Sequence, residues 1–492
     1  MPEKTGHYAI IEQFLADGMN YMFGNPGTVE QGFLDALDAY PAMNYILTLQ
    51  ESIAVLCADG YARATQQPAL VQIHSTPGLG NAIGNLYQAK RGHSPLVVIG
   101  GDAGIRYQAM DAQMAGDLVG MAEPVTKWAT MVKHPSSLLR VLRRAVRVAN
   151  TPPKGPVYVC LPQDILDAPV EEEVFPTSLP SMRTVPAGSF VQDAADMLAG
   201  ADRPRIYFGD GVSQSGGEAE LTQVAEMLGA PTYIVDAGDL TMSFSHPLFQ
   251  GSTGHMFGEH SLPITQEGDV NLVVGTYMVP EVFPKLGNIF APDAKTIHID
   301  LNAYEIAKNH PVDLSVVADP KSTLAQLADA LGETLGDEQR KRAAARTEEL
   351  RRAQHEQVAA EKKEDAERDG EAPIQFAKFA KTLASVLPDD AVIFDEALTS
   401  SPDLTRYLPP TTPGHFFQTR GGSLGVGFPG AIGLKLAHPE KTVVGVSGDG
   451  GSMYTIQSLW TAARHGVDVK FVVCNNSSYR LLQLNIEQFR NE

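Results

Sequence analysis

Short apolar runs that end at glycine, proline or polar residues alternate with amphipathic segments through the first third of the chain. The runs at 69–74, 96–100 and 155–162 carry few polar residues on either face. Strands that are apolar on both faces and alternate with helices are typical of a parallel sheet with helices on both sides. The pattern therefore predicts an α/β unit, with a helix over 9–18 and a sharp turn at 25–28.

The same alternation returns twice further along the chain. Four strands are predicted in the second unit, at 205–208, 232–235, 270–275 and 296–300. In the third unit, apolar runs begin at Val443 and Phe471. The chain is therefore predicted to form three doubly wound α/β domains with mainly parallel sheets, at 1–168, 188–336 and 373–492.

Two segments of different composition separate these units. The first, 168–186, is rich in proline and acidic residues, which predicts a linker. The second, 337–370, mixes both signs of charge with alanine and glutamine, which predicts a solvated helix rather than an arm for nucleic acid.

The charge balance narrows the classes of function. The 492 residues carry a formal net charge of −20, which argues against nucleic acid because a phosphate backbone needs a basic face. No apolar run reaches the ~18 residues of a membrane-spanning helix, and the N-terminus has no apolar signal core. The three cysteines, Cys57, Cys160 and Cys474, stand in apolar segments and imply no disulfide framework. A cytoplasmic protein with no membrane or nucleic-acid partner is expected.

Polar groups follow two apolar strands in the third unit. Gly448-Asp449-Gly450 comes after the run that begins at Val443, and Asn475-Asn476 comes after the run at 471–474. Since the carboxyl ends of parallel strands collect ligands, the Asp449 carboxylate and the Asn476 amide oxygen are expected to converge. Mg²⁺ prefers such oxygen ligands together with phosphate, and glycines let backbone amides approach a diphosphate. The pattern predicts a Mg²⁺-diphosphate site.

The structural alternative for this motif is a strand-end turn whose asparagines cap a helix. The chain contains a second Gly-Asp-Gly, at 209–211, which follows a strand but has no asparagine pair downstream. We interpret that copy as an ordinary turn. At the Asp449 copy, both halves of the motif favour the ligand site.

The spacing from Gly-Asp-Gly to Asn-Asn resembles the thiamine diphosphate motif of the pyruvate decarboxylase and acetolactate synthase superfamily. The resemblance implies that the three units are a pyrimidine-binding, a middle and a diphosphate-binding domain. It implies that Asp449, Asn476 and Ser478 hold Mg²⁺. The implied cofactor-binding residues are Glu51, Leu398, Thr399, Gly422, Leu424, Gly448, Asp449, Gly450, Gly451, Ser452, Asn476, Ser478 and Tyr479.

Two of these assignments depend on the segment 421–425. It resembles the chain segment that holds the aminopyrimidine ring of the cofactor in proteins of the family. The backbone carbonyl of Gly422 matches the acceptor of the 4′-amino group. The side chain of Leu424 matches the apolar residue that supports the bent cofactor. Without the neighbouring glycines, Leu424 would be interpreted as a core residue. Leu398 and Thr399 match a loop on the cofactor side.

Glu51 opens an apolar helix that ends in Asp59-Gly60-Tyr61-Ala62. A glutamate in the first turn commonly stabilises a helix through its dipole. The resemblance implies a catalytic role, because in this superfamily a glutamate at this place bonds to N1′ of the aminopyrimidine and promotes loss of the C2 proton. We favour the catalytic interpretation.

Within the superfamily, the benzoylformate decarboxylase group is the most similar. Asn25-Pro26-Gly27-Thr28, Leu49-Gln50-Glu51, His74, Gly78-Leu79-Gly80-Asn81 and His93-Ser94-Pro95 occur in its order. The resemblance implies that the Thr28 hydroxyl binds the substrate carboxylate and that His74 transfers protons. A lone histidine before a proline-glycine turn is more often structural, but the surrounding motif favours the catalytic role.

The chain departs from that group in three places. The group has a second active-site histidine in the segment that matches 276–283, where this chain has none; His255 and His260 lie upstream and are expected at the surface. Gln418 and Asn485 stand where the group places aromatic residues, while Leu482 stays apolar, so a smaller or more polar 2-oxo acid than benzoylformate is expected. The family continues beyond the asparagine pair, so the third domain is expected to be incomplete.

Three functions follow as hypotheses. The first is nonoxidative decarboxylation of a 2-oxo acid to an aldehyde and CO₂, with thiamine diphosphate and Mg²⁺. The second is carboligation of the acetolactate synthase type, for which FAD in the middle domain would be expected. The third is a non-catalytic homologue, which the presence of Glu51, Asp449 and Asn476 disfavours. In this superfamily, Glu51 and Asp449 come from different subunits, so a homodimer or homotetramer is expected.

Overall fold

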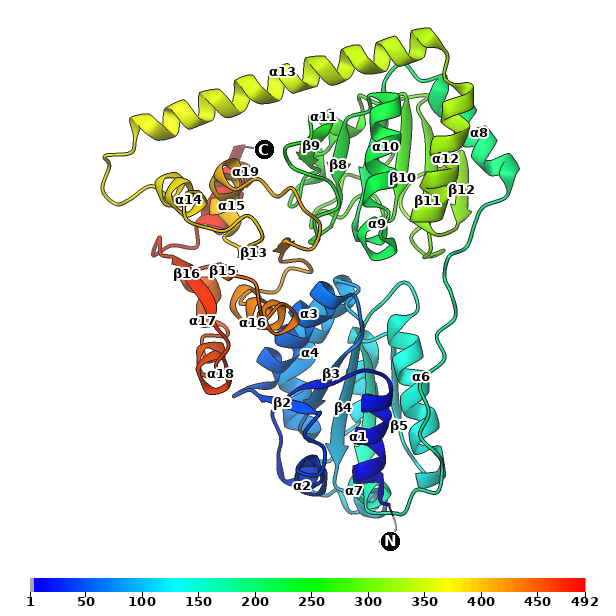
Figure 1. Ribbon diagram of the computed structural model, residues 1–492, viewed down its shortest axis with the longest axis vertical. Helices are drawn as coiled ribbons and strands as arrows, with labels where there is room; N and C mark the ends of the chain where they lie inside the picture. Colours follow the sequence, from blue (N-terminus) through cyan, green and yellow to red (C-terminus); the bar gives the residue numbers. More distant parts are fainter. Residues whose placement is uncertain (1–3, 492) are drawn as a thin grey trace. The chain divides into compact units, whose positions relative to one another are not determined.

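The computed structural model describes residues 4–491, and within them the chain forms three sheets flanked by helices (Figure 1). Every strand pair whose register is defined runs parallel, which confirms an α/β fold with three parallel sheets. Two compact units are present. The first holds the described residues up to Pro180 together with Asp390–Ala397 and Thr419–Ser478, and the second holds Ser181–Asp389, Leu398–Gln418 and the residues from Tyr479 onward.

The first sheet, in the first unit, has the strand order β2-β1-β3-β4-β6-β5. Its central strands β3, β4 and β6 are buried along their whole length, because helices cover both faces. The strands are β1 Tyr21–Gly24, β2 Asn44–Leu47, β3 Ala69–Ile73, β4 Leu96–Asp102, β5 Trp128–Met131 and β6 Val157–Pro162.

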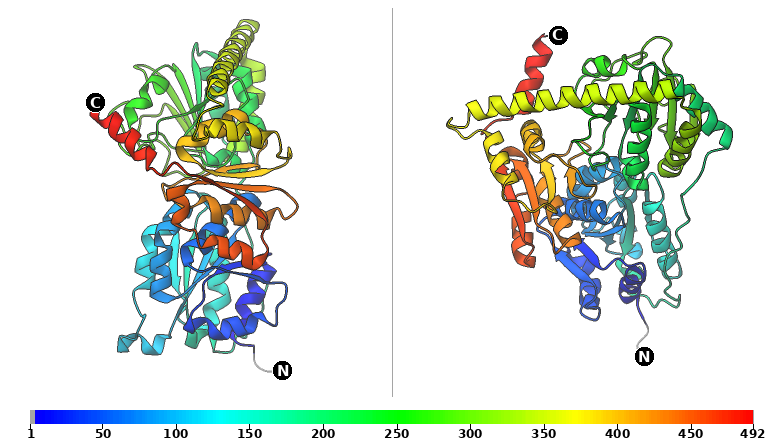
Figure 2. Two further views of the ribbon diagram at one scale, coloured as in Figure 1. Left: turned by 90° about the vertical axis from the view of Figure 1, so that its left-hand side faces the viewer. Right: turned by 45° about the horizontal axis from the view of Figure 1, so that its top comes forward.

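Two groups of helices enclose this sheet. Side chains of α1, α6 and α7 form one core with Leu70, Val97 and Val159 of the sheet. The helices α3 and α4 also contact the sheet, and both views of Figure 2 show helices around it. The helices are α1 Gly6–Ala16, α2 Gln31–Leu37, α3 Glu51–Thr65, α4 Ser75–Arg91, α5 Leu118–Ala122, α6 Leu138–Asn150 and α7 Gln163–Leu166.

The third sheet follows the order β14-β13-β15-β16. The first unit contains its strands β13 Val392–Glu396, β15 Val443–Gly448 and β16 Val469–Cys474, with the helices α16 Gly427–Ala437, α17 Asp449–Met453 and α18 Ser458–His465. The helix α16 packs closely on α3 of the same unit. A Cβ atom on Gly433 would lie 2.0 Å from the Cys57 carbonyl oxygen, and one on Gly60 would lie 2.2 Å from the Gly430 carbonyl oxygen. Glycine on both helices therefore permits this backbone contact.

The second unit contains a sheet with the order β12-β11-β10-β7-β8-β9. Its strands are β7 Pro204–Phe208, β8 Thr232–Ile234, β9 Phe249–Ser252, β10 Val270–Val274, β11 Lys295–Asp300 and β12 Leu314–Val317. The other elements of this unit are α8 Gly188–Ala199, α9 Asp210–Ser215, α10 Glu218–Leu228, α11 Leu262–Thr265, α12 Pro320–Thr334, α13 Asp337–Glu367, α14 Phe376–Ala384, β14 Phe416–Gln418, α15 Ser401–Tyr407 and α19 Arg480–Asn491. The helix α13 buries only Ala343, which agrees with the predicted solvated helix.

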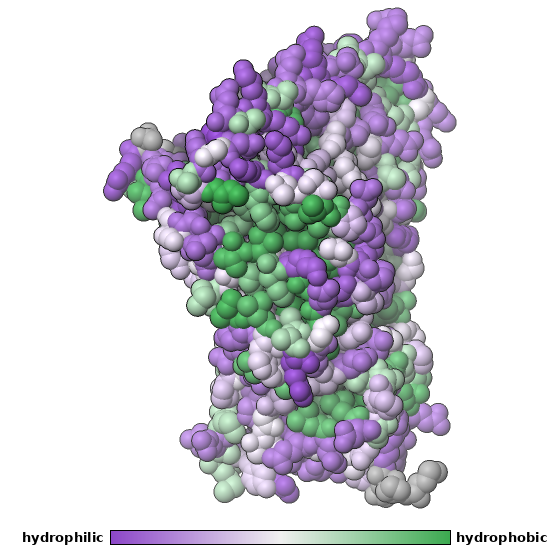
Figure 3. Space-filling model, turned by 60° about the vertical axis from the view of Figure 1, so that its left-hand side comes forward, coloured by the Kyte–Doolittle hydropathy of each residue, from purple (hydrophilic) through white to green (hydrophobic). Residues whose placement is uncertain are grey.

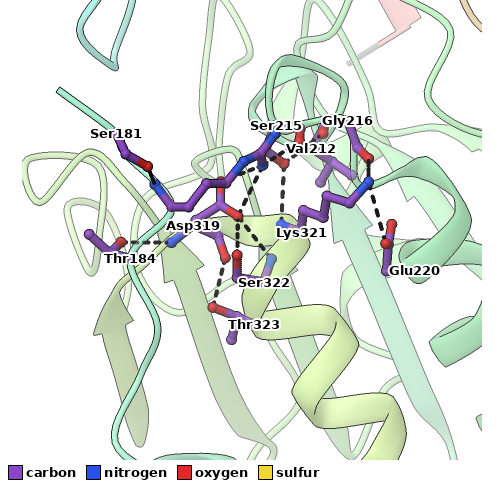
Figure 4. A network of polar contacts seen from close by, with 11 residues as sticks. Ser181, Thr184, Val212, Ser215, Gly216, Glu220, Asp319, Lys321, Ser322 and Thr323 are labelled. Carbon is purple, nitrogen blue, oxygen red and sulfur yellow. Dashed lines mark hydrogen bonds and ion pairs between the residues drawn. The ribbon is translucent and has the colours of Figure 1, made fainter. Parts of the chain in front are cut away.

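The end of the predicted linker is held to the second unit by a polar network around Asp319, which caps α12 (Figure 4). The Asp319 carboxylate accepts the amide of Ser322 at 2.9 Å and pairs with the Arg183 guanidinium at 3.1 Å. The Thr184 hydroxyl oxygen accepts the Asp319 amide at 3.1 Å. Chain from Ser181 onward is therefore fastened to this unit rather than free.

The second Gly-Asp-Gly of the chain is a structural turn. Asp210 begins α9 directly after β7, and its buried carboxylate accepts the amides of Gly238 and Asp239 at 3.1–3.2 Å. A Cβ atom on Gly211 would lie 2.6 Å from the Gly275 Cα atom, so the turn packs against the end of β10. These contacts support its interpretation as an ordinary strand-end turn.

Candidate active site

The strand register defines one edge of the site in the third sheet. Gly448 of β15 pairs with Cys474 of β16, so the two strands end at the same level. Asp449 directly follows one strand, and Asn475 and Asn476 follow the other. The carboxylate and amide groups that the sequence singles out therefore leave the sheet at one edge.

The residues at this edge fit a Mg²⁺-bound diphosphate. The Ser478 hydroxyl oxygen is buried and has no hydrogen-bond partner, and the Ser478 amide donates to the Asn476 side-chain oxygen at 2.9 Å. A Cβ atom on Gly448 would meet nothing within 4 Å, so the backbone there borders open space. Oxygen donors beside open, glycine-lined backbone suit a hard cation and its phosphate. Among the residues described, no group of three or more His, Cys, Asp or Glu side chains is placed so that it could hold a metal ion.

Glu396 holds the glycine-rich segment that precedes α16. One carboxylate oxygen accepts the amides of Gly425 at 2.6 Å and Val426 at 3.2 Å; the other accepts the Gly427 amide at 2.7 Å and the Ser447 hydroxyl at 2.9 Å. Burial raises the pKa of Glu396, and these hydrogen bonds oppose the rise. The carboxylate fixes the chain next to Gly422 and Leu424. Sequence reasoning gave Glu396 no role, although its position at a strand end was a signal.

Glu51 begins α3 and is only 6% exposed. Its Oε2 atom accepts a hydrogen bond from the Asn81 amide nitrogen at 2.9 Å. A Cβ atom on Gly78 would lie 2.7 Å from its Oε1 atom, so glycine leaves room for the carboxylate. Gln50 caps the helix by accepting the Ser52 amide at 2.7 Å. Gln50 thus already caps the start of the helix. Glu51 is not needed as a cap, so its carboxylate can serve a catalytic role.

His74 and Thr28 leave the same edge of the first sheet. Gly24 of β1 pairs with Gln72 of the parallel strand β3, so the turn that carries Thr28 and the residue after β3 are neighbours. Nδ1 of His74 lies 2.8 Å from Oε2 of Glu30, a buried residue that the sequence analysis did not identify. Thr28 is exposed.

Six candidate residues belong to the second unit. Leu398 and Thr399 lie in a 3₁₀ turn after β13, where Leu398 has a strained positive φ of 50°. Gln418 ends β14, and its amide donates to the Gly238 carbonyl oxygen at 2.6 Å. Tyr479 precedes α19, and that helix carries Leu482 and Asn485. The proposed roles of these residues at the site therefore remain predictions. His255 and His260 are exposed, as expected.

Oxygen donors and glycines at the carboxyl ends of parallel strands are typical of α/β proteins that bind a phosphate-containing cofactor. Three family models match the chain: Thiamine pyrophosphate enzyme, N-terminal TPP binding domain, at residues 4–121; central domain, at 191–327; and C-terminal TPP binding domain, at 399–492. The chain belongs to the thiamine pyrophosphate enzyme family.

Relatives divide between two activities. The chain is 30% identical to the acetolactate synthase isozyme 3 large subunit of Escherichia coli, over 97% of this chain and 83% of that protein. It is 28% identical to benzoylformate decarboxylase of Pseudomonas aeruginosa, over 98% of this chain and 87% of that protein. A solved thiamine diphosphate-dependent 4-hydroxybenzoylformate decarboxylase of Rhodococcus jostii is 26% identical, with a TM-score of 0.85 over 99% of this chain and 89% of that chain. The chain is thus a thiamine diphosphate-dependent enzyme of the decarboxylase and acetolactate synthase family.

Proposed function

We propose that this protein catalyses the nonoxidative decarboxylation of a 2-oxo acid to an aldehyde and CO₂, with thiamine diphosphate and Mg²⁺. The observation that carries the proposal is the environment of His74. Nδ1 pairs with Glu30, whereas Nε2 has no hydrogen-bond partner among residues 4–491, and the side chain is 16% exposed. A histidine in this setting is suited to delivering a proton. Aldehyde formation requires a proton at the carbon that has lost CO₂, whereas in carboligation that carbon bonds to a second carbonyl compound.

The chain offers residues for each part of this reaction. When bound, thiamine diphosphate would supply the electron sink for loss of CO₂. Glu51 would bond to the aminopyrimidine ring, and the Gly422 carbonyl would accept its amino group. The Thr28 hydroxyl would bind the substrate carboxylate, and His74 would donate the final proton.

The Mg²⁺ site is proposed at Asp449, Asn476 and Ser478. The buried, unpartnered hydroxyl of Ser478 supports this assignment, since a cation would satisfy it. The adjacent residues Gly448, Gly450, Gly451 and Ser452 would border the diphosphate. In the structure, Ser452 already donates its hydroxyl to the Asp449 carbonyl oxygen at 3.0 Å.

A homodimer or homotetramer is proposed as the working form. Large apolar side chains are exposed on the third-sheet part of the first unit: Met453 at 65%, Tyr454 at 59% and Val473 at 48%. Figure 3 shows hydrophobic residues gathered on one face of the molecule. Exposed apolar side chains of this size are common where a protein surface meets a partner, which supports an oligomer. We place the enzyme in the cytoplasm; no helix among the described residues is long and apolar enough to cross a membrane.

The proposed substrate is a 2-oxo acid smaller or more polar than benzoylformate. Two of the predicted pocket residues, Gln418 and Asn485, are polar, and Leu482 is the apolar member. Such a lining would bind an aliphatic or hydroxylated side chain more readily than an unsubstituted phenyl ring.

Carboligation of the acetolactate synthase type is the second candidate, favoured by the 30% identity to the E. coli acetolactate synthase subunit. That function predicts FAD, so a purified protein with the flavin absorption spectrum would support it. A colourless, active protein would support the decarboxylase.

Product analysis by NMR tests the proposal directly. The purified protein is incubated with thiamine diphosphate, Mg²⁺ and a panel of aliphatic and aromatic 2-oxo acids, with and without an added aldehyde. Free aldehyde and CO₂ from single substrates are expected. Acetohydroxy acids or acyloins as the main products would move the protein to the carboligase branch, and no turnover together with no cofactor binding would favour a non-catalytic homologue.

A further inference from the structure

A buried carboxylate, that of Glu30, is hydrogen-bonded to the ring of His74. Glu30 is only 5% exposed, and its Oε2 atom lies 2.8 Å from Nδ1 of His74. The same oxygen accepts the Gly27 amide at 2.8 Å. An ionised carboxylate accepts hydrogen bonds and cannot donate them, so Nδ1 must carry a proton when the pair is formed. Nε2 is then the ring atom that remains for proton exchange.

Two glycines shape the backbone around this pair. A Cβ atom on Gly27 would lie 2.3 Å from Nδ1 of His74, and one on Gly101 would lie 2.2 Å from Oε1 of Glu30. The φ of Gly27 is −135°, an extended conformation open to any residue, so the need for glycine there is steric. The ring and the carboxylate therefore occupy the space that side chains at both positions would fill.

Among the groups described around Glu30, His74 is the one that can neutralise the charge of its carboxylate. Burial raises the pKa of Glu30, while the Gly27 amide, His74 and the Gly101 amide lower it. The phenols of Tyr45 and Tyr158 face the same region, and the pKa of each is raised chiefly by burial, with Glu30 as a further cause. Neutral phenols do not balance a carboxylate, whereas a protonated imidazole does.

We infer that Glu30 is a positioning residue for His74: it keeps Nδ1 protonated, sets the ring plane and stabilises the doubly protonated ring. The inference rests on the proposed function, in which His74 donates the final proton. In that step the Nε2–H bond of the imidazolium breaks and the proton forms a C–H bond in the product. The ring is left neutral with Nδ1–H still bound to Glu30, whose carboxylate stays ionised throughout.

The first test is Glu30→Gln, which keeps the size of the side chain and removes its charge. We expect kcat to fall about 10-fold or more with KM changed less, because a charge-assisted hydrogen bond to the proton donor is lost. Glu12→Gln is the matched control, since Glu12 accepts a hydrogen bond from the Tyr40 hydroxyl at 2.8 Å and touches no site residue; its kcat and KM should match those of the native protein. A native kcat in Glu30→Gln, or a KM that rises as much as kcat falls, would overturn the inference.

The second test needs no substrate. In the native protein with ¹⁵N-labelled histidine, the ring of His74, assigned by comparison with His74→Gln, should show the neutral Nδ1–H form at high pH. A neutral Nε2–H form would overturn the inference. This result is independent of turnover: a native protein that shows the Nδ1–H form but decarboxylates no 2-oxo acid contradicts the proposed function, while the pairing of Glu30 with His74 stands.

Discussion

Glu51 and Glu30 are both buried carboxylates at the carboxyl edge of the first sheet, yet the structure gives them different partners. Glu51 accepts a neutral amide from Asn81, whereas Glu30 binds a histidine ring and a backbone amide. The first arrangement leaves one carboxylate oxygen facing the space beside Gly78. In the second arrangement, the charge of the Glu30 carboxylate is balanced when the His74 ring is doubly protonated. Residue type alone does not distinguish these two settings.

Replacing Glu51 with glutamine should nearly abolish the exchange of the C2 proton of bound thiamine diphosphate, by about two orders of magnitude or more, because the group that bonds to the aminopyrimidine is lost. Cofactor affinity should change much less. Hydrogen–deuterium exchange at C2, followed by NMR, measures the effect, and titration calorimetry measures the affinity. Exchange at the native rate would remove Glu51 from the proposed catalytic role.

Asp300 predicts a pH dependence of stability. Burial raises the pKa of its carboxyl group to about 7, with Glu305 as a smaller cause. Since the folded-state pKa lies above the unfolded value, its contribution to stability is complete below about pH 4 and is lost as the pH rises through 7. Asp300→Asn should therefore be more stable than the native protein at pH 8, by about 1–3 kcal/mol, and equal to it near pH 4. Urea unfolding at both pH values checks this; parallel pH profiles would contradict it.

At the scale of helices and strands, the strands that the hydrophobic pattern fails to predict lie mostly at the edges of the sheets. The predicted strands at 69–74, 96–100, 205–208 and 270–275 are central and mostly buried and apolar, and the structure confirms them. The pattern does not predict β2, β5, β9, β12 or β14, each of which is an edge strand of its sheet, although it does predict the edge strand β16 from the apolar run that begins at Phe471. An edge strand is short and half-covered, so its residues need no continuous apolar run.

The glycine-rich segment before α16 depends on one side chain from another element. In Glu396→Gln, an amide group would face the amides of Gly425 to Gly427, so a buried acceptor is lost. We expect a loss of about 2–4 kcal/mol in the free energy of unfolding and a weaker affinity for thiamine diphosphate, because Gly422 and Leu424 would no longer be held.

Urea unfolding and cofactor titration measure both effects. Glu361→Gln is the matched control, because Glu361 pairs with Arg406 in a partly exposed ion pair at 2.8 Å and should cost at most about 1 kcal/mol. Equal losses in the two variants would show that Glu396 does not hold the segment.

For the whole molecule, cofactor binding should be visible as stability. A ligand present at 100 times its Kd stabilises the folded chain by about 2.7 kcal/mol, so thiamine diphosphate with Mg²⁺ should raise the melting temperature of the native protein by several degrees. Asp449→Ala, or removal of Mg²⁺ with a chelator, should abolish most of that increase. Thermal unfolding with and without the cofactor checks this, and an unchanged increase in Asp449→Ala would contradict the metal assignment.

The sequence by itself determined the class of fold and the family, because buried central strands need apolar runs and a diphosphate site needs glycines and oxygen donors at strand ends. It singled out Asp449 and Asn476 for the same reason, whereas Glu51 and His74 were singled out by the resemblance to the superfamily. Only the tertiary structure showed that Glu30 is hydrogen-bonded to His74 and that Glu396 accepts backbone amides of the glycine-rich segment. Both pairs join residues more than 25 positions apart, and a hydrogen bond between distant residues leaves no periodic trace in the chain. Its partners become recognisable only when folding brings their strands together.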